Sequence, residues 1–301
     1  MQTALKNQRG IYRYVHDQTM RQANQGATMD EIAENIGEPD FAKTDFGVRD
    51  YYGTLNHNSK AVYQRYFGWW DAVPAHYHEL PPVQASKKYV AAMGGTDRAL
   101  AVGEKAFNEG DYRWAATVFN HIVFADPASE AAKKWLASTY EQLGFQAEAG
   151  TWRNIYLVGA RELREGNNSK NSISSANAKV LSGIPAVDLF DAMATRFNPA
   201  KMQGDGGIIR FWFPDRKEAV SIDLDKSVMF PRGEDYAITA DGSDTQITIS
   251  RDLFTRLLMR KVTAPELIRD KEMLISGNTA LLAAIFGALD EVNPQFDIVT
   301  P

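Results

Sequence analysis

Apolar residues recur at helical spacing along most of the first half of the chain. Residues 3–25 carry them near one face and are followed by Gly26, which predicts one long helix. Residues 28–31 have the pattern of a capping box and predict a short helix that Gly37 closes. A further helix is expected over residues 82–93, because Pro is favoured in a first helical turn.

Residues 49–71 concentrate aromatic side chains together with Arg, Lys, His and Asn. Either Asn56 or Asn58 is expected to cap a helix that runs to about Phe67, since a short polar side chain accepts from first-turn amides. His57 and Lys60 then lie at a helix N-terminus, where backbone amides favour anions. The alternative interpretation is that the aromatic residues form a core and that the Asn is only a cap.

A repeat of 34 residues follows. Gly110 and Gly144 stand at this spacing, and so do Ala115 and Ala149. The small residues at these positions resemble the tetratricopeptide pattern of paired helices. Two such pairs are too few for a free solenoid, so the array is expected to pack against the preceding helices or a second subunit.

Residues 166–177 are polar and rich in Asn and Ser, which indicates a linker with a domain boundary near residue 172. The sequence beyond it alternates between strand and helix patterns, which predicts an α+β domain with an antiparallel sheet. The expected domains are residues 1–166 and 173–301. Helices are expected over 185–197, 251–261 and 279–289, and strands over 208–213, 219–224, 227–230, 236–239, 246–249 and 273–276.

Composition narrows the functional classes. The 301 residues are 44% hydrophobic and 24% charged, as in ordinary globular proteins, and the net charge of −5 does not favour nucleic acid as a partner. The absence of Cys excludes disulfides and zinc–cysteine sites. No run reaches the roughly eighteen apolar residues of a transmembrane helix. The N-terminus has no signal-peptide core, so the chain as written is expected in the cytoplasm.

Three runs resemble the linear alkylsulfatases: LKNQRGIYRYVHDQT at 5–19, YYGTLNHNSKAVYQRYFGW at 51–69 and GDYRWAATVFNHIVFADP at 110–127. This resemblance implies a dimerisation domain of an enzyme family that hydrolyses dodecyl sulfate and similar esters, and whose members are often periplasmic or secreted. It also implies a separate catalytic domain of metallo-β-lactamase fold, which holds two zinc ions and is expected before residue 1. The runs IIRFWF and NPQFDIVTP resemble the sterol carrier protein type two fold.

No catalytic residue and no metal or other cofactor is expected in this chain. His76-Tyr77-His78 is followed by Glu79 and Leu80, whereas the family's zinc motif continues with Asp-His. The other His residues are isolated in the sequence, and no nucleophile motif of the G-x-S-x-G kind occurs.

The resemblance also implies a substrate site beside the catalytic domain. Arg49 and Lys60 would be cationic partners of a sulfate, and Tyr52, His57 and Asn58 hydrogen-bond donors. Asp50 would compete for Arg49. The alternative is that these five residues only hold the helical domain together.

Two functions are expected. The first is the C-terminal portion of an alkylsulfatase, which dimerises through residues before Gly166 and binds an alkyl sulfate. The alternative is a non-catalytic homodimeric module that binds amphiphiles or lipids. The sterol carrier resemblance implies an apolar groove for acyl chains in the second domain, where the alternative is a filled core. The residues expected to line the groove are Ile208, Phe211, Phe213, Val220, Ile222, Leu281, Leu282, Ile285 and Phe286.

Overall fold

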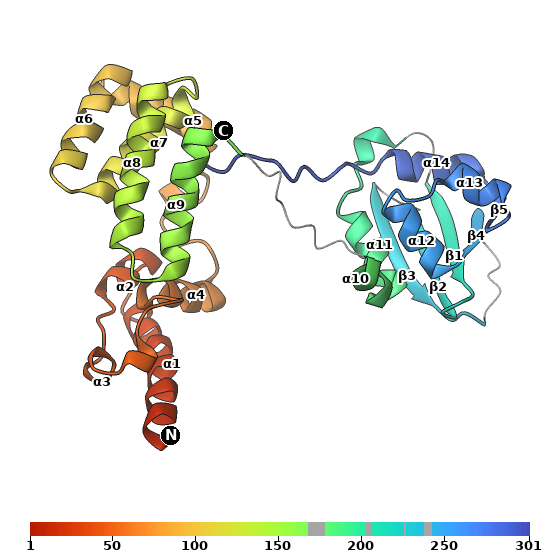
Figure 1. Cartoon of the computed structure of the whole chain (residues 1–301), viewed down its shortest axis with the longest axis horizontal. Helices are drawn as coiled ribbons and strands as arrows, with labels where there is room; N and C mark the ends of the chain where they lie inside the picture. Colours follow the sequence, from red (N-terminus) through yellow and green to blue (C-terminus); the bar gives the residue numbers. More distant parts are fainter. Residues whose placement is uncertain (168–177, 203–205, 226, 238–242) are drawn as a thin grey trace. The chain divides into compact units, whose positions relative to one another are not determined.

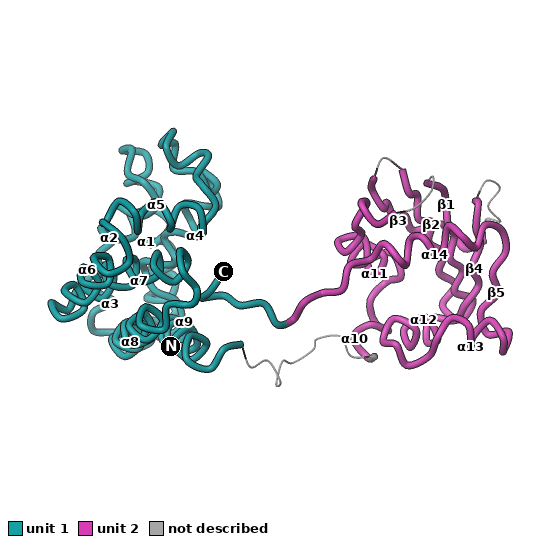
Figure 2. The backbone as a smooth tube through the Cα atoms, turned by 90° about the horizontal axis from the view of Figure 1, so that it is seen from above, with its two compact units in different colours: residues 1–168, 295–301 teal, residues 169–294 magenta. Residues whose placement is uncertain are grey.

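The chain forms two compact units. The computed structural model describes residues 1–167, 178–202, 206–225, 227–237 and 243–301. Unit 1 comprises residues 1–168 with 295–301, and unit 2 comprises residues 169–294 (Figure 2). The last seven residues therefore belong with the helical unit, whereas the expected second domain, 173–301, includes them. Most of the expected linker lies outside the described residues.

Unit 1 begins with short and long helices that cross one another. They are α1 (Gln2–Ala23), α2 (Met29–Asn35), α3 (Asp40–Lys43), α4 (Leu55–Phe67) and α5 (Pro82–Ala92), with 3₁₀ turns at Phe46–Val48 and Pro74–His76. Helix α4 packs on both α1 and α2. The predicted capping box of α2 is confirmed, because the amide and hydroxyl of Thr28 both donate to Glu31 at 2.8 Å.

Two helical hairpins follow, side by side in Figure 1: α6 (Thr96–Asn108) with α7 (Tyr112–Ala125), and α8 (Glu130–Gln146) with α9 (Gly150–Glu165). Helices α6 and α8 begin 34 positions apart, but α8 has 17 residues against 13 in α6. The period is therefore lost within the second hairpin. Gly110 lies in the turn after α6 with φ 81°, whereas Gly144 lies inside α8 against Leu157.

The array packs against segments before and after it in the sequence. Helix α5 covers α7, and Val299 of the C-terminal segment joins the core of the hairpins. At the centre, Phe119 is fully buried and stacks on Trp135 with 5.9 Å between ring centroids. Gly103 makes room for it, since a Cβ there would lie 2.5 Å from the Phe119 ring.

Unit 2 is a sheet with helices. Its elements are α10 (Ala178–Gly183), α11 (Ala186–Ala194), β1 (Gly207–Phe213), β2 (Glu218–Asp225), β3 (Val228–Glu234), β4 (Thr245–Ile249), α12 (Arg251–Leu258), α13 (Ala264–Arg269), β5 (Met273–Gly277) and α14 (Thr279–Gly287), with a 3₁₀ turn at Pro199–Lys201. The strand order is β3-β2-β1-β4-β5. A helical region followed by a sheet-and-helix domain is therefore confirmed.

The prediction of an antiparallel sheet is wrong in one pairing. β4 runs parallel to β1, whereas the other three pairs are antiparallel. After β3 the chain crosses to the far side of β1 instead of continuing as a meander, and the sheet is therefore mixed. The predicted strand at 236–239 is also wrong where it is described, because Tyr236 and Ala237 form a turn and β3 instead continues to Glu234.

One face of the sheet builds the core. Ile209, Phe211 and Phe213 alternate along β1 and pack with side chains of α11, α12 and α14. Ile208 has the opposite parity, so its assignment to the apolar groove is wrong. Phe213, Val220, Ile222, Leu281 and Ile285 are closed core residues, with at most 5% of the surface of each exposed.

A buried arginine fastens α10 and α11 to this core. Arg251 opens α12 and is 2% exposed. Its Nη2 donates to the carbonyl of Ile184 at 2.8 Å, and its Nε lies 3.2 Å from a Glu218 carboxylate oxygen. Burial lowers the pKa of Arg251, so these partners must hold a charge that is removed from water.

Candidate functional site

The N-terminus of α4 is already capped by its own chain. The hydroxyl of Thr54 accepts from the amide of His57 at 2.9 Å, and Asp50 accepts from the amide of Leu55 at 3.0 Å. Neither Asn56 nor Asn58 caps the helix, so that prediction is wrong. Two first-turn amides that an anion would need are therefore occupied.

Both Asn residues have other roles. The Asn56 amide donates to the carbonyl of Ala33 at 2.9 Å and ties α4 to the end of α2. The Asn58 side chain lies against Gly53, where a Cβ would be 2.9 Å from the Asn58 oxygen. Asn56 therefore joins two helices, and Asn58 packs on the loop that leads into α4.

The two cations of the predicted site each have an acidic partner. Arg49 Nη2 lies 2.5 Å from Glu148, which precedes α9, and Lys60 Nζ lies 2.6 Å from Asp30 of α2. His57 is exposed, and Tyr52 is 82% exposed while its carbonyl accepts from the Thr151 hydroxyl. The five predicted residues thus lie in the loop before α4 or in its first two turns, and the two cations among them are paired with acids.

A hollow of about 560 Å³ lies between α4 and the second hairpin. Lys60 is the one predicted site residue that lines it. Its lining is Glu34, Asp50, Thr54, Asn56, Lys60, Arg113, Leu143, Gln146, Ala147, Glu148, Ala149, Trp152 and Tyr156. Burial raises the pKa of Asp50, whereas the hydrogen bond from Arg113, 2.9 Å long, lowers the pKa of Glu34.

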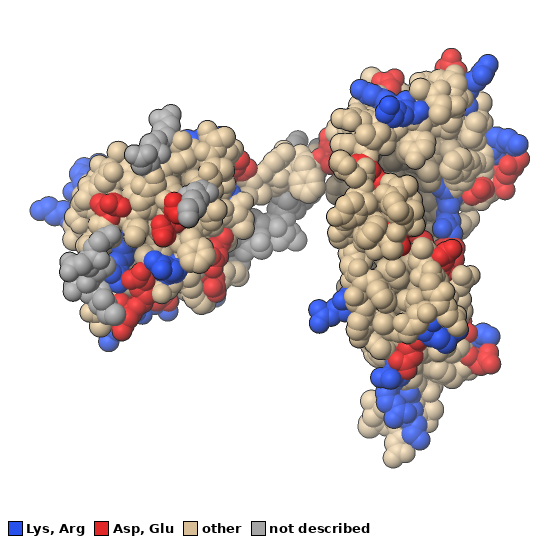
Figure 3. Space-filling view, turned by 180° about the vertical axis from the view of Figure 1, so that it is seen from behind, with Lys and Arg blue, Asp and Glu red and all other residues tan. Residues whose placement is uncertain are grey.

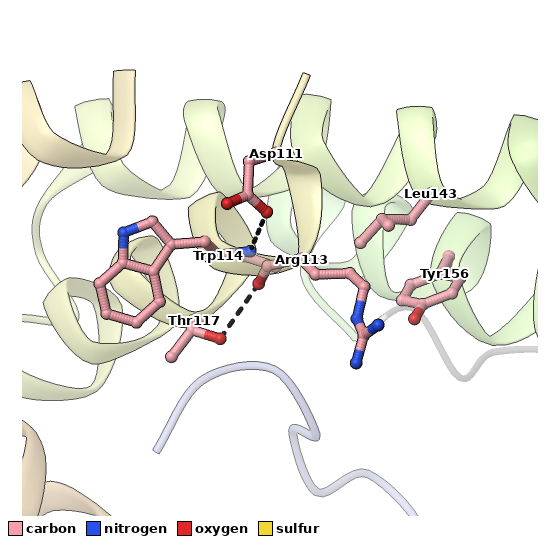
Figure 4. Close-up of a pocket in the computed structure, with 7 residues that line it drawn as sticks. Asp111, Arg113, Trp114, Thr117, Leu143 and Tyr156 are labelled. Carbon is pink, nitrogen blue, oxygen red and sulfur yellow. Dashed lines mark hydrogen bonds between the residues drawn. The ribbon is translucent and has the colours of Figure 1, made fainter. Parts of the chain in front are cut away.

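Arg113 also borders a second, shallow hollow of about 500 Å³ (Figure 4). Figure 4 shows its side chain reaching toward Leu143 of α8 and Tyr156 of α9, while Trp114 turns to the other side. Asp111 caps α7 by accepting from the amide of Trp114 at 3.2 Å. Arg113 therefore lies between two hollows. The sequence analysis did not identify it, because only the folded arrangement of α7, α8 and α9 places it there.

The described residues offer no metal centre. Among them, no three His, Asp or Glu side chains come close enough together to hold a metal ion. His76 instead pairs with Asp71 at 2.7 Å, and this hydrogen bond raises its pKa. The two zinc ions that the resemblance implies for the catalytic domain have no matching ligand group among the residues that this structure describes.

Unit 2 contains an apolar pocket of about 600 Å³ between the sheet and helices α12 to α14. Its lining is Met193, Arg196, Phe211, Ile247, Phe254, Leu257, Leu258, Arg260, Ala264, Ile268, Met273, Ile275, Thr279, Leu282, Ala283, Phe286, Leu289 and Glu291. Of the groove residues that the sequence predicts, Phe211, Leu282 and Phe286 line it. We name it the apolar pocket.

The two guanidinium groups of the apolar pocket come from Arg196 and Arg260. Arg196 Nε donates to the carbonyl of Asp290 at 2.8 Å, and Arg260 forms an ion pair with Glu291. The sequence analysis missed both. No local pattern marked them, because each lies near the end of a predicted amphipathic helix, where a basic residue is common.

The surface is mixed in charge on the face that Figure 3 shows, where basic and acidic side chains are interspersed on both units. Within the described part of the chain, no helix is long and apolar enough to cross a membrane.

Residues 28–166 match the family model described as alkyl sulfatase dimerisation, and residues 174–301 match the model described as alkyl sulfatase C-terminal. The alkyl/aryl-sulfatase BDS1 of Saccharomyces cerevisiae is 40% identical over 99% of this chain and 45% of its own length. The structure of the stereoselective inverting sec-alkylsulfatase Pisa1 from Pseudomonas sp. is 34% identical in sequence and superposes with a TM-score of 0.91. The match covers 99% of this chain and 46% of the Pisa1 chain.

Sterol carrier proteins are also among the structural neighbours. Sterol Carrier Protein 2 from Yarrowia lipolytica, in its apo form, covers 36% of this chain and 89% of its own, with 23% identity and a TM-score of 0.24.

The chain spans about half the length of the alkylsulfatases that it matches. The two matched models are the dimerisation and C-terminal domains of that family. The chain therefore belongs to the alkylsulfatase family, of which it contains the dimerisation domain and the C-terminal domain.

Proposed function

We propose that this chain supplies the dimerisation and C-terminal part of an enzyme that hydrolyses sulfate esters of long-chain alcohols, such as dodecyl sulfate. The observation that carries the proposal is the apolar pocket of unit 2, which also holds the side chains of Arg196 and Arg260. An apolar cavity with guanidinium groups suits a molecule with an alkyl tail and an anionic head. A pocket of about 600 Å³ is large enough for a dodecyl chain.

Each part of such a ligand would meet a matching group. Burial of each methylene contributes about 0.8 kcal/mol, so a chain of twelve carbons has a large driving force to enter. A guanidinium can donate two hydrogen bonds to one oxyanion. Arg260 must exchange Glu291 for the sulfate, and this competition tempers the affinity.

In unit 1 we propose that Arg49, Tyr52, His57, Asn58 and Lys60 form part of the substrate site of the complete enzyme. Support comes from an exposed aromatic surface just beyond them, which consists of Phe67, Trp69, Trp70 and Tyr77. The Tyr77 ring packs on both Trp rings, at centroid distances of 6.1 and 4.9 Å. Such an ordered apolar surface is typical of a protein interface. We propose that the catalytic domain of metallo-β-lactamase fold docks here.

Activity tests this assignment directly. The purified chain is expected to release no sulfate from dodecyl sulfate with added zinc, and to do so when a separately produced catalytic domain is supplied. The restored activity is expected to fall in the Arg49→Ala and His57→Ala variants. Zinc-dependent turnover by the chain alone, abolished by changing His76 and His78, would show that the metal site had been wrongly dismissed.

A non-catalytic homodimer that binds amphiphiles is the second candidate. It is favoured by the fact that all residues that line the apolar pocket lie in unit 2. Both candidates require a homodimer formed through residues before Gly166, which the match to the dimerisation model supports. Light scattering at micromolar concentration is expected to give the mass of a dimer, and a monomer would contradict both.

Binding of dodecyl sulfate below its micelle concentration tests the apolar pocket itself. Calorimetry is expected to show binding to the whole chain, with a negative heat-capacity change, and loss of binding in Ala283→Trp, which fills the pocket. Leu274→Trp is the matched control, because Leu274 is exposed and absent from the pocket lining. Equal binding by both variants would place the ligand elsewhere.

A further inference from the structure

The C-terminal segment is held on unit 1 through its backbone. One oxygen of the Glu162 carboxylate, Oε1, accepts from two successive amides, those of Ile298 at 2.6 Å and Val299 at 3.0 Å. Asn167 Nδ2 donates to the carbonyl of Phe296 at 2.6 Å. Three hydrogen bonds along four residues therefore fix the direction and the register of the segment.

One side chain of the segment is inserted and its neighbours are not. Val299 is 9% exposed, whereas Phe296 and Ile298 are 63% and 69% exposed. Val299 rests against the face of α9 that Gly159 leaves open, because a Cβ on Gly159 would lie 3.3 Å from both Val299 and Tyr140. A glycine inside a helix lowers the free energy of unfolding by about 0.5–1 kcal/mol relative to Ala. Its presence opposite Val299 is explained by the room that it leaves.

We propose that this face of α9 is a peptide-docking site and that residues 295–301 are its ligand, bound in cis. We call it the tail site and define it by Tyr140, Gly159, Glu162 and Asn167. Its recognition rule is a bent backbone that presents two successive amides to one carboxylate oxygen, with a β-branched apolar side chain on the second of these residues that enters the notch at Gly159. Beside the segment lies a hollow of about 570 Å³, lined by both the segment and α9, so the docked peptide does not fill the site.

The tail site changes how the two matched domains are connected. Residues 295–301 fall within the C-terminal family model, but they complete the core of the unit that the dimerisation model covers. Unit 2 is therefore inserted between two segments of unit 1. Loss of the segment is expected to uncover Tyr140 and the face of α9 at Gly159.

A peptide-binding experiment tests the proposal. A chain that ends at residue 294 is expected to bind a labelled peptide of residues 295–301 in fluorescence anisotropy, and the intact chain to bind it at least tenfold more weakly because its site is occupied. In the shortened chain, Glu162→Gln is expected to weaken binding about tenfold, since Gln offers a neutral acceptor. Glu165→Gln on the same helix is the control and should have no effect. Failure of the shortened chain to bind the peptide would overturn the proposal.

Cross-linking of the intact chain gives a second readout that does not depend on the shortened chain. The sequence has no Cys, so Asn167→Cys with Phe296→Cys introduces the only two thiols. A short bis-maleimide is expected to join them within one chain. The absence of a cross-link would overturn the docking, and a cross-link formed between chains that carry one thiol each would overturn the assignment in cis.

Discussion

The guanidinium of Arg49 and the carboxylate of Glu148 lie 2.5 Å apart and form an ion pair between the loop before α4 and the segment before α9. Both side chains are about half exposed, so water screens the pair and its contribution to stability is small. The main effect of the pair is that it makes the Arg49 guanidinium less available to an anion. An oxyanion that approaches Arg49 must first displace an acid that already occupies the guanidinium.

Glu148→Gln is therefore expected to strengthen the binding of inorganic sulfate at Arg49. Removal of an exposed competing charge is worth at most about 1 kcal/mol, which corresponds to a gain in affinity of about fivefold or less. The shift of the Arg49 Nε–H resonance during a sulfate titration measures it. Glu141→Gln is a matched control, because it frees Arg164 at a distant position on α8 and α9. An unchanged titration of Arg49 would show that Glu148 does not compete.

Gly103→Ala is expected to destabilise unit 1 by about 1–3 kcal/mol, because the new Cβ would overlap the buried Phe119 ring. Gly37→Ala is the control in the same unit, since no atom lies within 4 Å of the added Cβ; it is expected to be neutral or slightly stabilising. Urea unfolding followed by Trp fluorescence reports mainly on unit 1. Equal stability of the two variants would contradict the packing at Phe119.

Arg251→Ala is expected to destabilise unit 2 by about 3–5 kcal/mol, because Glu218 loses its partner and α10 loses its anchor. Arg251→Lys should restore little, since an ammonium group cannot reproduce the fork that reaches Ile184 and Glu218 together. Arg256→Ala, exposed on the same helix, should change stability by less than about 0.5 kcal/mol. Thermal unfolding by circular dichroism compares the three, and a stable Arg251→Ala variant would refute the anchor.

The pair of His76 and Asp71 predicts a pH dependence. The hydrogen bond raises the pKa of His76 above 6.5 and lowers the pKa of Asp71 below 3.8. The stabilisation from His76 is complete below its ordinary pKa and is lost as the pH rises through the raised value. The contribution from Asp71 is lost as the pH falls through its lowered value. Between these limits the exposed aromatic surface is expected to be most ordered.

An NMR titration of the His76 ring checks this prediction. Asp71→Asn is expected to bring the pKa of His76 back toward 6.5, whereas Glu79→Gln, a more distant acid, should change it little. No change in Asp71→Asn would rule out the pair as the cause.

Local chemistry in the sequence predicted the elements well where a single turn carries the information. Thr28 and Glu31 cap α2 as their spacing indicates, and Ser250 caps α12 through the amide of Leu253. The cap of α4 was predicted at the wrong residue because Thr54, Asn56 and Asn58 all have suitable side chains. The Asn56 side chain instead donates to the carbonyl of Ala33 on another helix, and this partner cannot be read from the sequence near α4.

Features that depend on distant pairs could not be predicted in this way. The parallel pairing of β1 with β4 follows from a crossover that no local pattern encodes. The partners of Arg49 and Lys60 come from segments far away in the sequence, so the predicted site residues were named without the acids that hold two of them. Val299 likewise lies in a short irregular segment. No periodicity there shows that it is a core residue of the helical unit.

The insertion of unit 2 between the helices of unit 1 and Val299 has a consequence during translation. The ribosome makes α5 to α9 first and must then add the whole of residues 169–294 before Val299 emerges. Until then the nascent helical unit keeps an open apolar edge beside Gly159 and Tyr140. Because exposed apolar edges recruit chaperones or partner chains, a newly made helical unit is expected to pair or be shielded before its own last segment arrives.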